Sequence, residues 1–307
     1  MNETPARTQI PPHVLDTAVA VVGPGAIGTV IAAALHDAGR APMLCGRTPR
    51  ERLTLRIDDE RIIVPGPVHT DPRDVSTPPD IVFLAVKATQ TTDAAPWLDA
   101  LCGPDTVVCV LQNGVEQIRT VRPLAPRAAE VVPAVVWFPA QAESDGTVRL
   151  RADPRLTLPT TPGGERVAAA LEDTRCTVDL ADGFTTLAWQ KLLQNAAAGL
   201  MALTGLRAGM FTRPDIADLT RAYLRECLTV ARAEGVQLDD DIPDTILTRF
   251  QSFPADMGTS ILTDRERGRP LEWDARNGVI TRLARTHRIP TPVSDTVAAL
   301  LAAISDG

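Results

Sequence analysis

The sequence predicts an α/β protein that begins with a doubly wound parallel sheet and ends in an all-helical domain. In the first half, short apolar runs without a polar face alternate with helix-forming segments, as expected of strands buried on both sides. A glycine cluster, Gly23–Gly28, follows the first of these runs. From about residue 182 the chain instead consists of long segments rich in alanine and leucine. These three observations indicate the fold class.

A chain of 307 residues is long enough for two domains. We expect a flexible leader over residues 1–16, whose prolines stand without an apolar signal core. The first domain is expected over residues 17–182 and the helical domain over residues 183–307. Element boundaries carry a few residues of slack.

The expected elements follow from hydrophobic runs and from glycine, proline and aspartate at their ends. We expect strands over residues 18–22, 41–45, 62–64, 80–86, 106–111, 131–138 and 148–150. We expect helices over residues 27–38, 185–203, 214–234, 243–253, 271–287 and 292–304.

Composition excludes several classes of function. The net charge is -7, which argues against a nucleic-acid or anionic-membrane surface, because phosphate neutralisation needs clustered lysine and arginine. The cysteines form no CxxC pair and no metal-type spacing, so we expect buried free thiols, no metal and a reducing, cytoplasmic location. The five are Cys45, Cys102, Cys109, Cys176 and Cys227.

The glycine cluster is a complete G-x-G-x-x-G at the first strand–helix turn. Its first glycine permits the tight turn, its second lets a pyrophosphate approach the backbone, and its third lets the helix pack closely. The helix N-terminus offers amide groups to the anion. This context predicts a Rossmann domain that binds a dinucleotide through Gly23, Pro24, Gly25, Ala26, Ile27 and Gly28.

The end of the second expected strand indicates which dinucleotide. NAD enzymes usually place an aspartate or glutamate there to bind the adenosine ribose. This chain has Gly46-Arg47-Thr48 instead. A guanidinium binds two phosphate oxygens and suits a 2′-phosphate, so we expect NADPH/NADP+ with Arg47 as a contact. The alternative for Arg47 is a solvated basic loop.

Polar residues follow two of the expected buried strands. Lys87 comes after residues 80–86, and Asn113 comes after residues 106–111. Ligands of doubly wound sheets bind beyond the carboxyl ends of strands, which favours a functional role. Asn113-Gly114 is equally compatible with a simple turn.

The helical half contributes a second set of polar residues. Lys191 and Asn195 are four residues apart and share one helix face amid alanine and leucine. Such a lysine either extends to solvent or lies in a cleft, and periodicity alone favours the first. Further on, Glu272, Asp274 and Asn277 open a helix, and Asp274 fits simple helix-start electrostatics.

These motifs, in this order, resemble the ketopantoate reductases (2-dehydropantoate 2-reductases) from about residue 18 to the last helix. The resemblance rests on five features: GPGAIG at 23–28, Lys87 at its strand end, QNG at 112–114, WQKLLQN at 189–195 and LEWDARNG at 271–278. It implies NADPH-dependent reduction of a branched 2-keto acid on the pathway to pantothenate.

The resemblance also implies roles for individual residues. Lys191 matches the catalytic lysine of the family and Glu272 its acidic partner. Asn113 matches an asparagine between nicotinamide and substrate, and Lys87 a lysine on the cofactor side. Two further positions match residues that contact the substrate: Asn195 and Ser260.

The chemistry agrees with these roles. Hydride addition to a ketone leaves a developing alkoxide, and a lysine ammonium can stabilise that charge and then donate a proton. A nearby carboxylate would keep the lysine charged, whereas a dry cleft would lower its pKa.

The chain departs from the family pattern at Gly199 and near Gly209, where asparagines usually help to bind the keto acid. A reductase of another 2-keto acid is therefore one alternative. A dinucleotide-binding sensor without turnover is a second. The partner expected is a small 2-keto acid, and the apolar helical surface is sufficient for a homodimer.

Overall fold

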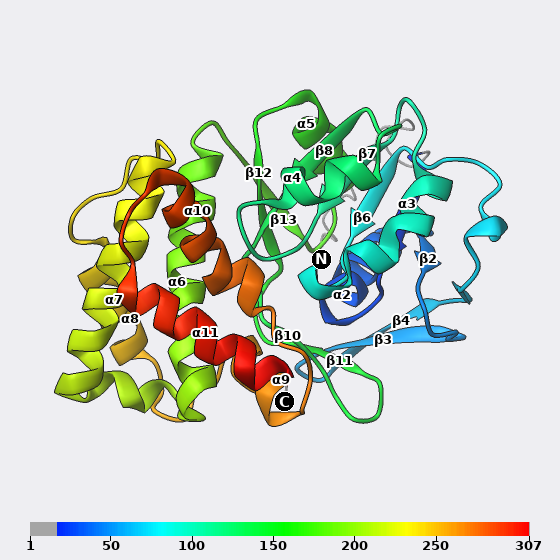
Figure 1. Ribbon diagram of the computed structural model, residues 1–307. Helices are drawn as coiled ribbons and strands as arrows, with labels where there is room; N and C mark the ends of the chain where they lie inside the picture. The colour runs from blue at the N-terminus through cyan, green and yellow to red at the C-terminus, as the bar shows by residue number, and fades with distance from the viewer. Residues whose placement is uncertain (1–16, 307) are drawn as a thin grey trace, which may run out of the picture. The chain divides into compact units, whose positions relative to one another are not determined.

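The computed structural model describes residues 17–306 and is drawn as a ribbon in Figure 1. The chain folds into two compact units. The described part of the first unit comprises residues 17–86, 93–111 and 121–181, and that of the second comprises residues 87–92, 112–120 and 182–306. The leader expected over residues 1–16 lies outside the described residues. The assignment of cofactor and substrate roles to the two predicted domains stays a prediction.

The first unit is built on a six-stranded sheet in the order β5-β2-β1-β6-β7-β8, and all five of its strand pairs are parallel. Its strands are β1 Val19–Val22, β2 Met43–Cys45, β5 Val68–His69, β6 Ile81–Leu84, β7 Val107–Val110 and β8 Glu130–Pro133. The chain moves outward from β1 to β5 and then returns to the other side of β1 with β6. This order confirms the doubly wound sheet that the sequence predicts.

Alternate residues of β1 show that helices cover both faces of this sheet. Val19 and Val21 belong to one apolar cluster with helices α2 (Ala26–Asp37) and α5 (Pro162–Ala170). Ala20 and Val22 belong to another cluster with α3 (Ala95–Leu101). Because successive side chains of a strand point to opposite faces, α3 covers the face opposite to α2 and α5.

The first unit also contains two smaller sheets. One has the order β10-β11-β3-β4 and the other β13-β12-β9. Their strands are β3 Arg52–Ile57, β4 Glu60–Pro65, β9 Val135–Val136, β10 Ala140–Ala142, β11 Val148–Leu150, β12 Arg155–Pro159 and β13 Thr177–Ala181. The expected strands 62–64 and 148–150 therefore lie outside the doubly wound sheet. In β4, exposed and buried residues alternate, as is typical of a strand with one solvated face.

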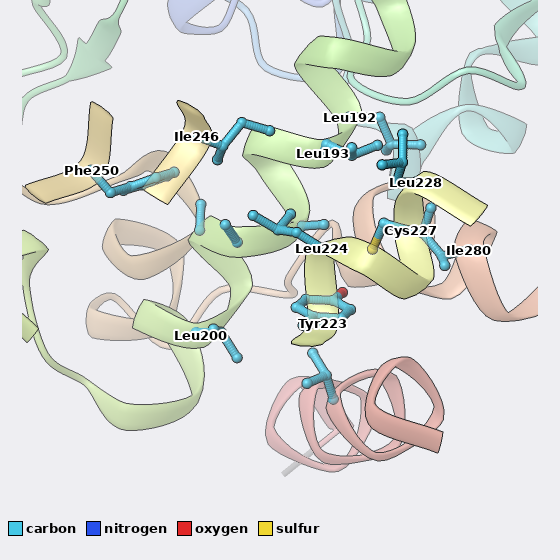
Figure 2. Close-up of a cluster of buried hydrophobic side chains, with 14 of the residues drawn as sticks. Leu192, Leu193, Leu200, Tyr223, Leu224, Cys227, Leu228, Ile246, Phe250 and Ile280 are labelled. Atoms are coloured by element: carbon cyan, nitrogen blue, oxygen red, sulfur yellow. The ribbon is translucent and has the colours of Figure 1, made fainter. Parts of the chain in front are cut away.

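The second unit is helical, as expected. Its elements are η2 Ala88–Gln90, α6 Phe184–Thr204, η5 Ala208–Thr212, α7 Pro214–Ala233, α8 Ile242–Ser252, α9 Ser260–Glu266, the π-helix Asp274–Gly278, α10 Val279–His287 and α11 Pro292–Asp306. The short helix α4 Gln117–Val121 begins within this unit. Figure 2 shows its core, where Tyr223 and Leu224 of α7 lie among leucines of α6 and Phe250 of α8.

All five cysteines are buried and free of disulfides, in agreement with the sequence analysis. Burial raises the pKa of Cys45 to about 12 and that of Cys102 to about 11, so both stay protonated thiols near neutral pH. Between residues 17 and 306, no helix is long and apolar enough to cross a membrane.

Candidate functional site

The glycine-rich loop of the first unit has the backbone that its sequence predicts. Gly23 has a φ of +85°, and a Cβ there would lie 2.5 Å from Val86 Cγ1. A Cβ at Gly28 would lie 2.4 Å from the carbonyl oxygen of Gly23. Both positions therefore require glycine, one for the turn and one for the close approach of α2 to the loop.

The middle of the loop is open. The nearest atom to a Cβ built at Gly25 would be the Gly23 carbonyl oxygen at 4.0 Å. Helix α2 begins at Ala26, has no acidic residue in its first turn and has no side chain that caps its N-terminus. Its first amide groups can therefore bind an anion, and the loop fits the pyrophosphate of a dinucleotide.

The backbone next to Arg47 packs against this loop. The amide of Gly23 donates to the carbonyl of Cys45 at 2.8 Å, which ties the loop to the end of β2. A Cβ at Gly46 would lie 3.0 Å from Pro24 Cδ, so the backbone just before Arg47 packs against the loop. Arg47 itself is exposed. Its guanidinium is thus available to a phosphate, and the contact with the 2′-phosphate stays a prediction.

The second unit brings together the other predicted residues around Glu272, which is buried. Its Oε1 accepts the backbone amide of Ala88 at 3.0 Å, and its Oε2 accepts Asn113 Nδ2 at 3.3 Å. Asn113 Oδ1 in turn accepts Asn195 Nδ2 at 3.3 Å. Glu272, Asn113 and Asn195, which are far apart in the sequence, therefore form one hydrogen-bonded chain.

Two cations complete the cluster. Arg276 Nη2 lies 3.2 Å from Glu272 Oε2 and 3.0 Å from the hydroxyl oxygen of Ser260. Lys87 Nζ pairs with Asp264 Oδ2 on α9 at 2.6 Å. Lys87 and Ser260 were expected from the sequence, whereas Arg276 and Asp264 were not. Their signal was weak, since arginine and aspartate side chains usually lie on the solvated surface.

The turn that carries Asn113 is fixed by buried amide side chains. Gln112 Nε2 donates to Thr91 Oγ1 at 2.9 Å. Gln117 Nε2 donates to the carbonyl oxygens of Gly114 at 2.8 Å and Gln112 at 3.1 Å. Gly114 has a φ of +114°, and the chain bends at residues 113–115. The turn and the functional interpretation of Asn113 are compatible, because this turn aims the Asn113 side chain at Glu272.

The carboxyl group of Glu272 is ionised despite its surroundings. Burial by itself would raise its pKa, but the charge of Arg276, the amide of Ala88 and the charge of Lys87 outweigh burial and lower the pKa. Glu272 is therefore a fixed negative charge within this cluster of predicted site residues.

For Lys191, in contrast to Glu272, the effect of burial on the pKa is not outweighed by neighbouring charges. It is half-buried on α6, one turn before Asn195. Burial, with repulsion from Arg276 and Arg249, lowers its pKa to about 8. An ammonium that reached bulk water would keep its ordinary pKa, so the lowered pKa favours the cleft interpretation, and the role of Lys191 stays a prediction. A lysine with this pKa can both carry charge and give up a proton near neutral pH.

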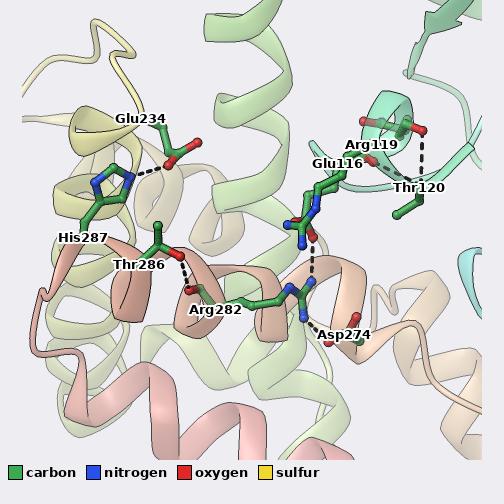
Figure 3. Close-up of polar contacts among 9 residues, drawn as sticks. Glu116, Arg119, Thr120, Glu234, Asp274, Arg282, Thr286 and His287 are labelled. Atoms are coloured by element: carbon green, nitrogen blue, oxygen red, sulfur yellow. Dashed lines mark hydrogen bonds and ion pairs between the residues drawn. The ribbon is translucent and has the colours of Figure 1, made fainter. Parts of the chain in front are cut away.

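Asp274, one of the acidic residues at the expected helix start, has a different environment. Arg282 contacts Asp274 Oδ1 and Glu116 Oε2, each at 2.6 Å, as Figure 3 shows. These contacts give Asp274 a role in holding segment 112–120. In the part of the chain that the structure describes, no group of three or more potential ligands could hold a metal ion.

Gly199 and Gly209 lie where the family resemblance leads us to expect asparagines. A Cβ at Gly199 would lie 2.6 Å from Asn277 Nδ2, and one at Gly209 would lie 3.1 Å from Ala255 Cβ. Asn277 is fully buried and donates to Tyr223 Oη at 2.8 Å and to the carbonyl oxygen of Ala196 at 3.1 Å. The core next to Gly199 is thus adapted to glycine.

Comparison with known proteins places the chain in a family. The description "Ketopantoate reductase PanE/ApbA" matches residues 19–163, and its C-terminal counterpart matches residues 184–305. The chain is 56% identical over 292 residues to a 2-dehydropantoate 2-reductase of Mycobacterium tuberculosis, covering 95% of this chain and 99% of the relative. Identity to the Caulobacter vibrioides protein of the same name is 38%, covering 93% and 98%.

A solved structure agrees over the same length. The dimeric ketopantoate reductase from Staphylococcus aureus superposes with a TM-score of 0.85 at 30% identity, covering 94% of this chain and 99% of that one. The two family descriptions together, and each of these relatives, cover most of the sequence. The chain therefore belongs to the PanE/ApbA family of ketopantoate reductases.

Proposed function

We propose that this protein catalyses the NADPH-dependent reduction of 2-dehydropantoate (ketopantoate) to pantoate, a step of pantothenate and hence coenzyme A biosynthesis. The family membership supports the reaction, and one observation in the second unit supports the chemistry. That observation is Lys191, whose pKa of about 8 suits a proton donor near neutral pH.

The predicted cofactor contacts are the glycine-rich loop, Arg47 after β2, and two residues that the family resemblance adds. The amides at the start of α2, from Ala26 to Gly28, would bind the pyrophosphate, and Arg47 would bind the 2′-phosphate. On the family resemblance, Lys87 and Asn113 are further cofactor contacts. When bound, NADPH supplies the hydride that adds to the keto carbon.

The proton and the charges are handled by the protein's own residues. Lys191 in its ammonium form stabilises the negative charge that develops on the keto oxygen and then transfers a proton to it. The neutral amine is reprotonated from solvent. Glu272 provides a fixed negative charge, and its bond to Asn113 orients that amide. Asn195 and Ser260 are proposed to contact the keto acid.

Gly199 and Gly209 favour one second candidate, the reduction of another 2-keto acid by the same chemistry. A substrate panel separates the two. Ketopantoate should be turned over with NADPH at the highest kcat/KM. A clear preference for another 2-keto acid would keep the lysine chemistry and change the substrate. NADPH binding without turnover of any keto acid would favour a dinucleotide sensor.

We also propose a cytoplasmic homodimer. The relative from Staphylococcus aureus is dimeric, and the buried free thiols fit a reducing compartment. Light scattering of the purified protein gives its mass in solution. A mass near twice 32.9 kDa supports the dimer, and a mass near 32.9 kDa contradicts it.

A further inference from the structure

The guanidinium of Arg276 has unused hydrogen-bonding capacity inside the protein. Arg276 is only 3% exposed. Its bonds to Ser260 and to Glu272 both leave from one nitrogen, Nη2. Its Nε is buried and has no hydrogen-bond partner among the described residues. A buried donor of a charged group is costly to leave unpaired, and a guanidinium edge matches a planar carboxylate.

Two residues with hydroxyl groups, Thr259 and Ser260, lie at the start of α9, and Ser260 contacts Arg276. The oxygen of Ser260 accepts from Arg276, so its own proton remains available to a further acceptor. Ser260 is exposed, which places it where a ligand can arrive from solvent. The hydroxyl of the preceding residue, Thr259, is buried without a partner in residues 17–306.

Two of the cations in this cluster are each paired with a carboxylate. Lys87 pairs with Asp264, and Arg276 pairs with Glu272. Lys191 adds a third cation, whose pKa is lowered by burial and by repulsion from Arg276. Exposed Arg249 adds to that repulsion. Cations therefore predominate among these side chains, which favours an anionic ligand.

The local backbone explains why Arg276 points inward. Residues Asp274–Gly278 form a π-helix turn, and Arg276 and Asn277 within it are both buried. Adjacent residues of an ordinary surface helix seldom both face the core. Single π turns inside helices are frequent at functional sites, since they aim extra side chains at one place.

We propose that Arg276 and Ser260 form the subsite that binds the carboxylate of the 2-keto acid, which leaves Lys191 to the keto oxygen. This assignment rests on the function proposed above. The guanidinium of Arg276 anchors the acid group by its charge and by hydrogen bonds. Lys191, which titrates near neutrality, acts on the oxygen that must receive a proton. Arg276 is thus assigned to substrate binding and Lys191 to proton transfer.

The test compares an acid with its neutral analogue. Initial rates are measured with ketopantoate and with its internal lactone, which has the same keto carbon but an esterified carboxyl group. The variants are Arg276→Gln, which retains a hydrogen-bond donor to Glu272 without the charge, and Arg276→Lys, which retains the charge without the planar guanidinium. Arg249→Met is the matched control, since it removes a cation that also acts on Lys191. Thermal unfolding of each variant checks its fold.

For Arg276→Gln we expect the KM of ketopantoate to rise about tenfold to a hundredfold, the loss typical of a charged hydrogen-bonded contact. The KM of the lactone should stay within about twofold, and added guanidinium should restore part of the loss. Arg276→Lys should be intermediate. Arg249→Met should change both substrates equally.

An equal rise of KM for acid and lactone in a folded Arg276→Gln variant would overturn the subsite, and so would an unchanged KM for both. If the unsubstituted enzyme turns over no ketopantoate, the proposed function fails independently. Calorimetric titration with 2-keto acids and their methyl esters then still tests the subsite. Acid binding that is stronger than ester binding, and that Arg276→Gln abolishes, supports the subsite, and equal binding contradicts it.

Discussion

The carboxylate of Glu272 accepts the backbone amide of Ala88 at 3.0 Å, although 184 positions separate the two residues in the sequence. A backbone donor cannot rotate away, so this bond fixes the position of the carboxylate more firmly than a side chain could. Lys87, next to Ala88, and Asn113, which also contacts Glu272, are thereby held in one arrangement.

Replacement of Glu272 should reduce stability in a pH-dependent way. In Glu272→Gln, buried Arg276 loses its counter-charge, and the free energy of unfolding should fall by about 3 kcal/mol. The pKa of Glu272 is lowered from 4.5, so its contribution is complete above that pH and is lost as pH falls through the lowered value. Urea unfolding at neutral and acidic pH measures the difference between variant and parent. A difference that grows on acidification would contradict the assignment.

Lys191 should set the alkaline limb of the pH profile. Its lowered pKa of about 8 means that the proton is lost above that pH, so the rate of keto-acid reduction should fall there. Lys191→Ala should lower kcat by at least about a hundredfold and remove this limb. Lys191→Arg retains a cation that does not deprotonate, and it should also lack the limb. A limb near pH 8 in either variant would assign the titration to another group.

Arg47 should determine the preference between the two dinucleotides. Arg47→Glu should weaken NADPH binding by about a hundredfold, through loss of charged hydrogen bonds, and NADH binding much less. Fluorescence titration gives both dissociation constants. Arg50→Glu is the matched control, because Arg50 is also exposed in the same loop. Equal weakening of NADH and NADPH by Arg47→Glu would remove the 2′-phosphate contact.

Gly199 should not accept the asparagine of the family pattern. A side chain there would lie within 2.6 Å of Asn277 Nδ2 and disturb its bond to Tyr223. Gly199→Asn should lower the free energy of unfolding by about 1–3 kcal/mol, the usual cost of overpacking. Gly183, at the start of the same helix, has a φ of -87° and no atom within 4 Å of a built Cβ. Gly183→Asn should therefore leave stability nearly unchanged, and similar losses in both variants would contradict this explanation.

Much of the fold follows from the sequence because its signals are local. Buried parallel strands such as β1 and β6 read as continuous apolar runs, and the loop at Gly23 needs only its own neighbours. The short helix α9 and the strand β3 were not expected, since neither has a distinct pattern of its own. Sheet membership of β4 is likewise set by a hairpin partner and not by its own residues.

The candidate site is less accessible to sequence reasoning. Lys191, Asn113 and Glu272 were expected from motifs, and the structure joins the last two directly. Arg276 and Asp264 were not expected, because their importance depends on burial and on distant partners. The lowered pKa of Lys191 could not be predicted for the same reason, since it results from burial and from the proximity of Arg276, and both arise only on folding.

NADPH-dependent reduction of ketopantoate is the function proposed for this chain. The most direct measurement follows NADPH oxidation by absorbance with ketopantoate beside a panel of other 2-keto acids, with NADH as the control. We predict that ketopantoate with NADPH gives the highest kcat/KM and that NADH is a poor donor. Turnover of a different keto acid alone, or bound NADPH with no oxidation across the panel, would contradict the account.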